Sequence, residues 1–179
     1  MTLFSLLIVV TTAATASDAL TDCTDVFKNR VSSIEYLYYP SRWLSGPTAH
    51  QWTASTWWSE TPDALSSPDF RWVVHDCGGS VCLELEAGAG DYLSVGSTPQ
   101  VVHRSNLIDV KKDPRFRFKI FCPNRCAATA ETTDSETFDG CQIRSAKDFS
   151  KLYTTAGGYA RSCRSCGRNF PRYYYLKGE

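Results

Sequence analysis

The sequence lacks the features that define several large classes of protein. Its 3 histidines are not paired at the spacing of metal ligands, and it has no phosphate loop, nucleotide fingerprint or nucleophile elbow. After the N-terminus, no stretch approaches the roughly 20 apolar residues that span a bilayer. No window keeps a helical period over a dozen residues. We therefore expect no cofactor, no bound metal, no membrane span and no catalytic activity, in a fold without long helices.

The N-terminus has the composition of a secretion signal. Residues 1–16 contain a short apolar run and end on Ala14-Thr15-Ala16, which matches a cleavage site with small residues at its first and third positions. The run is too short to cross a membrane. The sequence predicts a signal peptide at 1–16 and a secreted, extracellular chain at 17–179, whose size suits one domain.

The mature chain repeats one pattern three times. In each repeat an apolar residue is followed nine or ten positions later by a leucine, and an aromatic strand closes the repeat. The leading residues are Ile34, Leu83 and Ile143, the leucines are Leu44, Leu93 and Leu152, and the closing strands are residues 69–74, 115–121 and 171–177. A period near 50 residues indicates one supersecondary unit stacked on copies of itself.

Local patterns give the class of that unit. Polar and apolar residues alternate along residues 115–120, and Gly/Pro-containing turns punctuate the chain at short intervals. An all-β fold follows, with one short helical turn possible near residues 24–29. Three units of four short strands each close into a threefold β-trefoil, whereas three propeller blades would close poorly. We place the units at 31–77, 78–126 and 140–179, with an exposed polar loop at 127–139.

All eight cysteines follow the predicted cleavage site, and an even number in a secreted chain predicts up to four disulfides. Cys77 and Cys82 lie between units one and two, and Cys122 and Cys141 occupy the same places between units two and three. The repeat therefore predicts the pairs Cys77–Cys82 and Cys122–Cys141. The remaining cysteines, whose pairing the sequence leaves open, are Cys23, Cys126, Cys163 and Cys166. Zinc binding by Cys163 and Cys166, and by Cys122 and Cys126, is the competing interpretation.

Charge is divided unevenly along a chain whose net charge is zero. Residues 1–100 hold four basic and eleven acidic side chains, and residues 101–179 hold fifteen basic and eight acidic ones. One interpretation is a basic face for an acidic polysaccharide, phosphate or acidic partner. The other is that two halves of one domain neutralise each other.

Two stretches carry a likeness to a known family. Ser33-Ile34-Glu35 leads to the sequence YPSRWL at 39–44, and VCLE at 81–84 leads to GDYL at 90–93. This pattern resembles the arabinofuranose-binding β-trefoil modules attached to arabinofuranosidases, over essentially the whole mature chain. The resemblance implies a β-trefoil that binds sugar.

The same resemblance locates candidate sugar-binding residues. It implies a histidine two positions after each leucine and an aspartate three positions before each closing aromatic residue. The histidine positions hold Gly46, Val95 and Thr154, and the aspartate positions hold Ser67, Asp113 and Phe170. Unit two keeps the aspartate together with Tyr92, so Tyr92 and Asp113 are the predicted ligand-binding pair.

Other side chains allow more than one interpretation. Trp57 and Trp58 lie in an insertion-like segment, where they either form a contact surface or plug the open end of a barrel. Glu84 and Glu86 share one strand face and could be glycosidase carboxylates, although a solvated face or a cation site suits them better. His75 is expected to be structural. Basic strands with interleaved aromatic residues are better explained by a core than by nucleic-acid binding.

These observations favour a monomeric, non-catalytic binding protein. The first hypothesis is lectin-like recognition of an extracellular glycan. The alternatives are a structural, matrix, venom or effector protein that binds an extracellular protein, and a trefoil protease inhibitor whose contact loops lie at 45–68 and 123–139.

Overall fold

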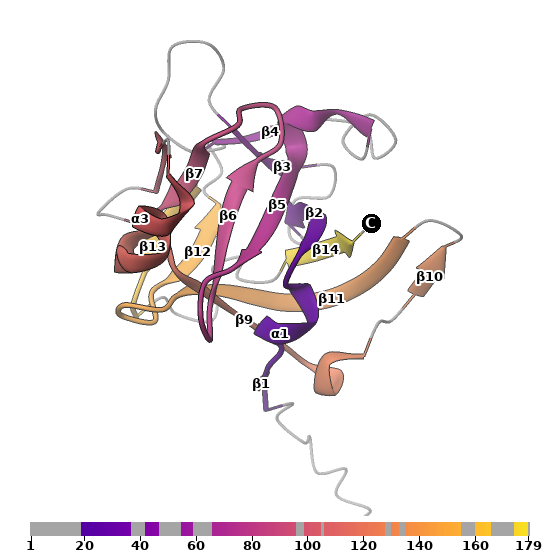
Figure 1. Ribbon diagram of the computed structural model, residues 1–179. Helices are drawn as coiled ribbons and strands as arrows, with labels where there is room; N and C mark the ends of the chain where they lie inside the picture. Colours follow the sequence, from indigo (N-terminus) through magenta and orange to yellow (C-terminus); the bar gives the residue numbers. More distant parts are fainter. Residues whose placement is uncertain are drawn as a thin grey trace, which may run out of the picture.

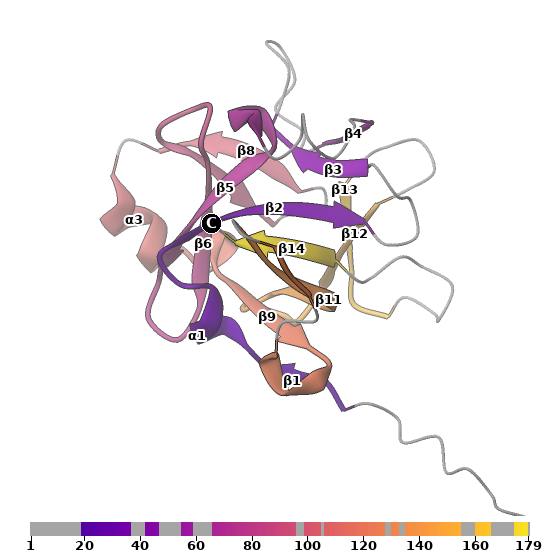
Figure 2. The ribbon, with the colours of Figure 1, turned by 90° about the vertical axis from the view of Figure 1, so that its right-hand side faces the viewer.

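Six strands close into an antiparallel barrel at the centre of the molecule (Figures 1 and 2). The computed structural model describes residues 19–36, 42–46, 55–58, 66–95, 99–104, 106–127, 130–132, 135–154, 160–165 and 174–178. In barrel order the strands are β2 (Arg30–Tyr36), β5 (Arg71–Asp76), β6 (Val81–Leu85), β9 (Phe118–Cys122), β11 (Ser135–Ser145) and β14 (Tyr174–Gly178). Each pairs with the next, and β14 pairs with β2 to complete the ring. A closed barrel leaves none of its six strands with a free edge.

Three hairpins interrupt the barrel at equivalent places. They are β3 (Arg42–Ser45) with β4 (Ser55–Trp58), β7 (Asp91–Ser94) with β8 (Gln100–His103), and β12 (Lys151–Thr154) with β13 (Ala160–Cys163). The first strand of each hairpin pairs with the preceding barrel strand at an equivalent position in each unit. The paired residues are Glu35 with Trp43, Glu84 with Tyr92, and Arg144 with Lys151. Unit one is thus β2–β5, unit two β6–β9 and unit three β11–β14, and the protein is a β-trefoil.

The repeated apolar residues form the shared core. The predicted leading residues and leucines are all 0–1% exposed, and one cluster contains them: Ile34, Leu83, Ile143, Leu44, Leu93 and Leu152. Equivalent side chains from three units therefore meet inside the barrel. This confirms the structural meaning of the sequence repeat.

Backbone hydrogen bonds repeat between units as well. The N–H of Gly46 donates to the carbonyl of Asp69, and the N–H of Val95 donates to the carbonyl of Arg115. Each acceptor lies in a short 3-10 turn before a barrel strand, Pro68–Phe70 in unit one and Pro114–Phe116 in unit two. Units one and two therefore place the residue after their first hairpin strand in the same surroundings.

The N-terminal arm and the disulfides tie the units together. The strand β1 (Thr21–Asp22) pairs with β9, and the single turn α1 (Thr24–Phe27) lies within the stretch where the sequence predicted one. Both predicted disulfides, Cys77–Cys82 and Cys122–Cys141, are present. Cys23 pairs with Cys126, one of the choices that the sequence left open, and Cys163 is disulfide-bonded too, against the zinc interpretation.

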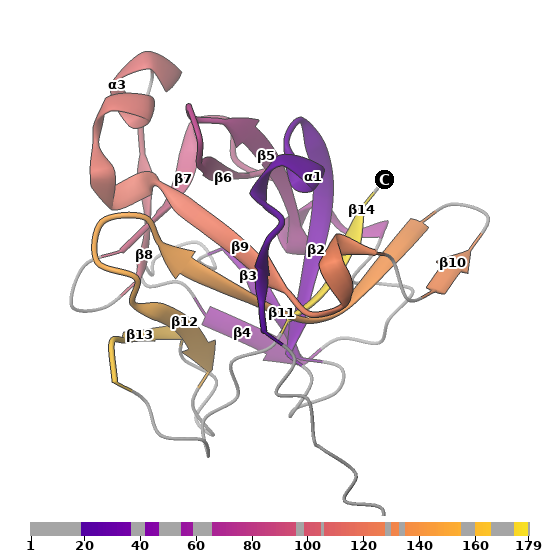
Figure 3. The same cartoon turned by 90° about the horizontal axis from the view of Figure 1, so that it is seen from below.

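The predicted loop at 127–139 is wrong in part. The strand β10 (Ala130–Thr132) pairs with the beginning of β11, which starts at Ser135, and this hairpin extends outward at one side of the molecule (Figure 3). Phe138 is buried, with its ring 4.8 Å from that of Phe27. The acidic, threonine-rich composition suggested a loop, but threonine is β-branched and suits a strand.

One helix gave no signal in the sequence. The helix α3 (Leu107–Lys112) follows β8, and its N-terminus is capped by Asn106, whose side chain accepts a hydrogen bond from the N–H of Ile108. Six residues are too few to show a helical period. None of the helices in the described ranges is long and apolar enough to cross a membrane.

Candidate functional site

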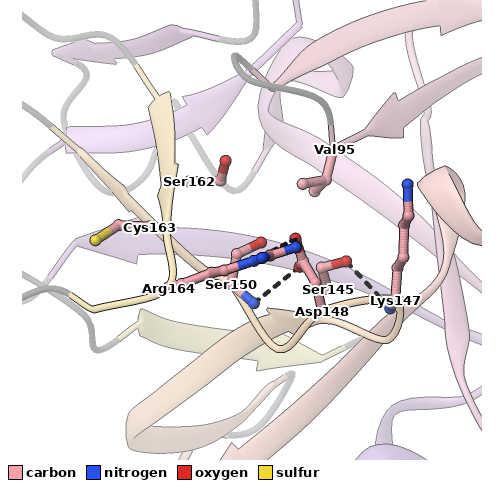
Figure 4. Close-up of a pocket in the computed structure, with 8 residues that line it drawn as sticks. All are labelled: Val95, Ser145, Lys147, Asp148, Ser150, Ser162, Cys163 and Arg164. Carbon is pink, nitrogen blue, oxygen red and sulfur yellow. Dashed lines mark hydrogen bonds and ion pairs between the residues drawn. The ribbon is translucent and has the colours of Figure 1, made fainter.

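A polar pocket of about 370 Å³ lies where unit three meets unit two (Figure 4). Its lining comes from the end of β11, the turn into β12, the end of β13 and the residue after β7. The lining residues are Val95, Ser145, Lys147, Asp148, Ser150, Ser162, Cys163 and Arg164. The volume falls within the range of small-ligand pockets. We call this the junction pocket.

One small residue explains why the junction pocket exists. Leu85 and Ser145 are equivalent, because each ends the first barrel strand of its unit, two positions after Leu83 or Ile143. Between units one and two, the side chain of Leu85 fills the space so completely that a Cβ on Gly46 would collide with it. Between units two and three, Ser145 faces Val95 across the pocket instead. Two methyl groups are absent from Ser145, and the space stays open.

A carboxylate is fixed within the junction pocket. The guanidinium of Arg164 donates to Asp148 Oδ2 from Nε at 3.1 Å and Nη2 at 3.0 Å, and the Ser150 N–H donates to Asp148 Oδ1 at 3.0 Å. Burial would raise the pKa of Asp148, but hydrogen bonds from Ser150 and Arg164 outweigh it and lower the pKa to about 2. Asp148 is therefore ionised and held by Arg164 in a fixed orientation at neutral pH.

Lys147 adds a second positive group to the pocket. Its backbone N–H donates to Ser145 Oγ, which positions the turn, while its side chain is exposed (Figure 4). Within the described part of the chain, no carboxylate lies at ion-pair distance from its ammonium group. The pocket therefore combines one paired carboxylate with two cations and several hydroxyl groups.

An aromatic residue in an unusual conformation adjoins the pocket. Phe149 lies between Asp148 and Ser150, has a φ of 57°, and is 54% exposed. An aromatic residue at positive φ is a strained arrangement, typical of functional positions, and costs about 1–3 kcal/mol. An exposed ring beside polar groups is also the usual platform for a sugar ring. Phe149 is the aromatic candidate that the sequence analysis missed.

The predicted ligand-binding pair lies elsewhere, in unit two. Tyr92 is only 4% exposed and packs edge-on against Phe116, with 6.5 Å between ring centroids. Burial, and after it the neighbouring Glu84 carboxylate, raise the pKa of Tyr92 to about 12. Asp113 caps the 3-10 turn that contains Phe116 and forms a 2.6 Å ion pair with Arg115, whose hydrogen bonds lower the pKa of Asp113.

Tyr92 thus packs against the turn that Asp113 caps, but Tyr92 offers no exposed platform. Their role in binding stays a prediction. Trp57 and Trp58 lie in β4, and their side chains are outside the described residues.

The acidic pair formed by Glu84 in β6 and Glu86 just after it is not a solvated face. Glu84 accepts hydrogen bonds from the Gly90 N–H at 2.6 Å and contacts His75 Nε2 at 2.5 Å, while Glu86 forms a 2.7 Å ion pair with Arg71. The side chains of Glu84 and Glu86 are 16% and 30% exposed. Both carboxylates are committed to partners, and the expectation that His75 is structural agrees with its contact to Glu84.

Signals for the junction pocket were present in the sequence but needed the fold to be interpreted. Ser145 stands where unit two has Leu85, and Lys147 and Asp148 occupy the turn that in unit two is glycine-rich. Pocket formation depends on the residue that faces Ser145 from another unit, and only the fold shows that this residue is Val95.

No protein-family model matches the sequence, and no curated protein matches it. Several solved structures share its fold. A Polyporus squamosus lectin bound to a human-type influenza-binding epitope is 12% identical, with a TM-score of 0.58 over 83% of this chain and 49% of the lectin. The chain thus spans about half the length of that lectin.

Two further structures match over almost their whole length. ThreeFoil, a designed 3-fold symmetric protein, is 10% identical, with a TM-score of 0.54 over 82% of this chain and 96% of its own. A salivary protein from Culex quiquefasciatus, of the Cysteine and Tryptophan-Rich family, is 13% identical, with a TM-score of 0.52 over 91% and 97% of the two chains. These likenesses support the β-trefoil. The narrower resemblance to arabinofuranose-binding modules is not shown.

Proposed function

We propose that the protein is a secreted, non-catalytic binding module that recognises an extracellular carbohydrate in the junction pocket. The observation that carries this proposal is the polar cavity opened by Ser145, with its oriented Asp148–Arg164 pair. Sugars present many hydroxyl groups, and a rigid array of donors and acceptors can bind several of them at once. The β-trefoil lectin among the structural neighbours adds a precedent for sugar recognition on this fold.

Three features support binding at this place. The side chains of Ser150 and Ser162 and the pair Asp148–Arg164 all line one cavity (Figure 4). Phe149, between the lining residues Asp148 and Ser150 in the chain, has an exposed aromatic side chain. The site also lies on strand ends that the barrel and the β12–β13 hairpin hold in place, so little entropy is lost when a ligand binds.

The test fills the junction pocket with the pair of residues that leaves no pocket between units one and two. Replacing Ser145 by Leu and Val95 by Gly reproduces the Leu85/Gly46 arrangement, which already packs between units one and two. We expect S145L/V95G to remain folded and to lose binding to every glycan that the wild-type chain retains on a glycan array. Isothermal titration with the best glycan then measures the loss, which should exceed tenfold.

Two further variants make the result specific. Phe149→Gly keeps the backbone conformation but removes the ring, so binding should weaken by about five- to tenfold while near-UV circular dichroism stays native in form. Ile108→Ser changes an exposed apolar residue on α3 and should leave binding unchanged. A wild-type chain that retains no glycan, or a folded S145L/V95G that binds as well as wild type, would overturn the proposal.

One observation favours a second candidate. The salivary protein matches nearly all of this chain and is matched over nearly all of its own length, and this chain also has 8 cysteines and 5 tryptophans. The second candidate is a secreted effector that binds an extracellular protein. A blank glycan array combined with specific capture of one extracellular protein, lost in S145L/V95G, would favour it.

A further inference from the structure

We infer that the ligand of the junction pocket is an anionic saccharide, one that carries a carboxylate or a sulfate group. This inference rests on the proposed function, because it names the class of sugar that the same pocket selects. Its basis is the contrast in charge between equivalent hairpins, together with the hydrogen-bonding groups that remain unused in the pocket.

Equivalent segments of units two and three differ sharply in charge. Residues 81–104, which cover β6 to β8, carry three acidic side chains and one basic one, a balance of −2. Residues 141–164, which cover the same part of unit three, carry five basic side chains and one acidic one, a balance of +4. The backbone pattern is the same in both units, so the fold does not require this difference. Two of the five basic side chains, Lys147 and Arg164, line the junction pocket, so part of this positive charge lies at the site itself.

The single carboxylate of unit three does not cancel that potential. Asp148 accepts two N–H donors of Arg164 at Oδ2 and the backbone N–H of Ser150 at Oδ1. A carboxylate already occupied on both oxygens is a weak acceptor for further sugar hydroxyls. Asp148 instead orients Arg164, and the pair as a whole is neutral.

The hydrogen-bonding groups that remain unused in the pocket are mainly N–H donors. A guanidinium has five N–H donors, and the Asp148 pair uses two of those of Arg164. Lys147 contributes three more donors and a full positive charge without a carboxylate partner among the described residues. Donors with a net positive charge match the oxygen atoms of a carboxylate or sulfate, whose charge-assisted hydrogen bonds are shorter and stronger than neutral ones.

The experiment compares matched acidic and neutral oligosaccharides by isothermal titration. A hyaluronan hexasaccharide, which has carboxylates but no sulfate, is paired with its carboxyl-reduced form. A keratan sulfate oligosaccharide, which has sulfates but no uronate, is paired with its desulfated form. We expect at least one acidic member to bind tenfold or more tightly than its neutral counterpart, and its affinity to fall as NaCl rises. The pair that shows the preference identifies the anionic group.

Variants assign the preference to the pocket. Lys147→Gln should reduce the acidic preference at least fivefold, Lys147→Arg should keep most of it, and S145L/V95G should abolish binding of both members. Lys112→Gln removes the same charge from the exposed surface of α3 and should change nothing. Equal binding of the acidic and neutral members, abolished by S145L/V95G, would overturn this inference and leave the proposed function standing. An acidic preference that Lys147→Gln and Lys112→Gln weaken equally would also overturn it. A wild-type chain that binds none of these saccharides would overturn both this inference and the proposed function.

Discussion

Asp148 stabilises the folded state as well as orienting Arg164, and it does so only while its carboxylate is ionised. Its pKa lies at about 2 in the folded protein, below the ordinary value of 3.8. A carboxyl group whose pKa is depressed on folding contributes stability above its unfolded pKa and loses that contribution as the pH falls through the folded pKa. The pH window is therefore about 4 down to about 2.

Asp148→Asn tests this contribution. The amide oxygen can still accept the N–H of Ser150, while the ion pair with Arg164 is lost. We expect the variant to be about 1–2 kcal/mol less stable than wild type at pH 7, a value kept low because Arg164 is 70% exposed. Urea unfolding at pH 7, 4 and 2.5 measures the difference, which should shrink towards zero at the lowest pH. A difference that stays constant across that range would contradict this assignment.

At the scale of elements, two disulfides differ in the length of chain that they enclose. Cys23–Cys126 joins residues 103 positions apart and anchors β1 beside β9, whereas Cys77–Cys82 joins residues only 5 positions apart between β5 and β6. A disulfide lowers the conformational entropy of the unfolded chain, and this stabilising effect grows with the number of residues in the loop that it closes. The long-range bond should therefore matter more.

Paired alanine substitutions measure this difference. The chain-entropy relation gives about 4.7 kcal/mol for a loop near 100 residues and about 2 kcal/mol for one of five. We expect Cys23→Ala with Cys126→Ala to lower the free energy of unfolding by roughly 2.7 kcal/mol more than Cys77→Ala with Cys82→Ala, as measured by guanidinium unfolding. Equal losses, or a larger loss for the short loop, would show that packing around the sulfur atoms outweighs the chain entropy.

The sequence predicted some strands and hairpins of the fold and missed others. The repeated apolar positions of each unit lie close in sequence, as Leu83 and Leu93 do, so the periodic pattern predicted the trefoil and two disulfides. The hairpin that includes β10 was missed because its sequence is polar. Phe138 of this hairpin packs against Phe27 of the N-terminal arm, and that partner is distant in sequence.

The candidate site was largely beyond the reach of the sequence for the same reason. Tyr92 matched a sugar-binding pattern, yet its neighbours Phe116 and Glu84 enclose it in the core. Conversely, Ser145 belongs to no recognisable motif, and its importance depends on Val95, which belongs to another unit. Whether a residue is buried or lines a cavity depends on what packs against it from elsewhere in the chain.

At the scale of the whole molecule, the closed barrel makes the three units interdependent. The last strand, β14, pairs with β11 on one side and with β2 on the other, so it joins unit three to unit one. In an open array of repeats, loss of the terminal strand would leave the other units folded. In a closed barrel, its loss exposes two strand edges and the apolar core that β14 covers.

A chain that ends at residue 169 tests this interdependence. Removing β14 should abolish the native fold as a whole, since β2 and β11 would each lose a partner and units one and two cannot close a barrel by themselves. We expect loss of the near-UV circular dichroism, absence of a cooperative thermal transition, and aggregation on size-exclusion chromatography. As a matched control, a chain that begins at residue 21 loses only the segment before β1 and should unfold in one transition close to that of the chain beginning at residue 17. A truncated chain that keeps a cooperative transition would mean that units one and two fold without the third, and the barrel would then be an assembly of independent parts.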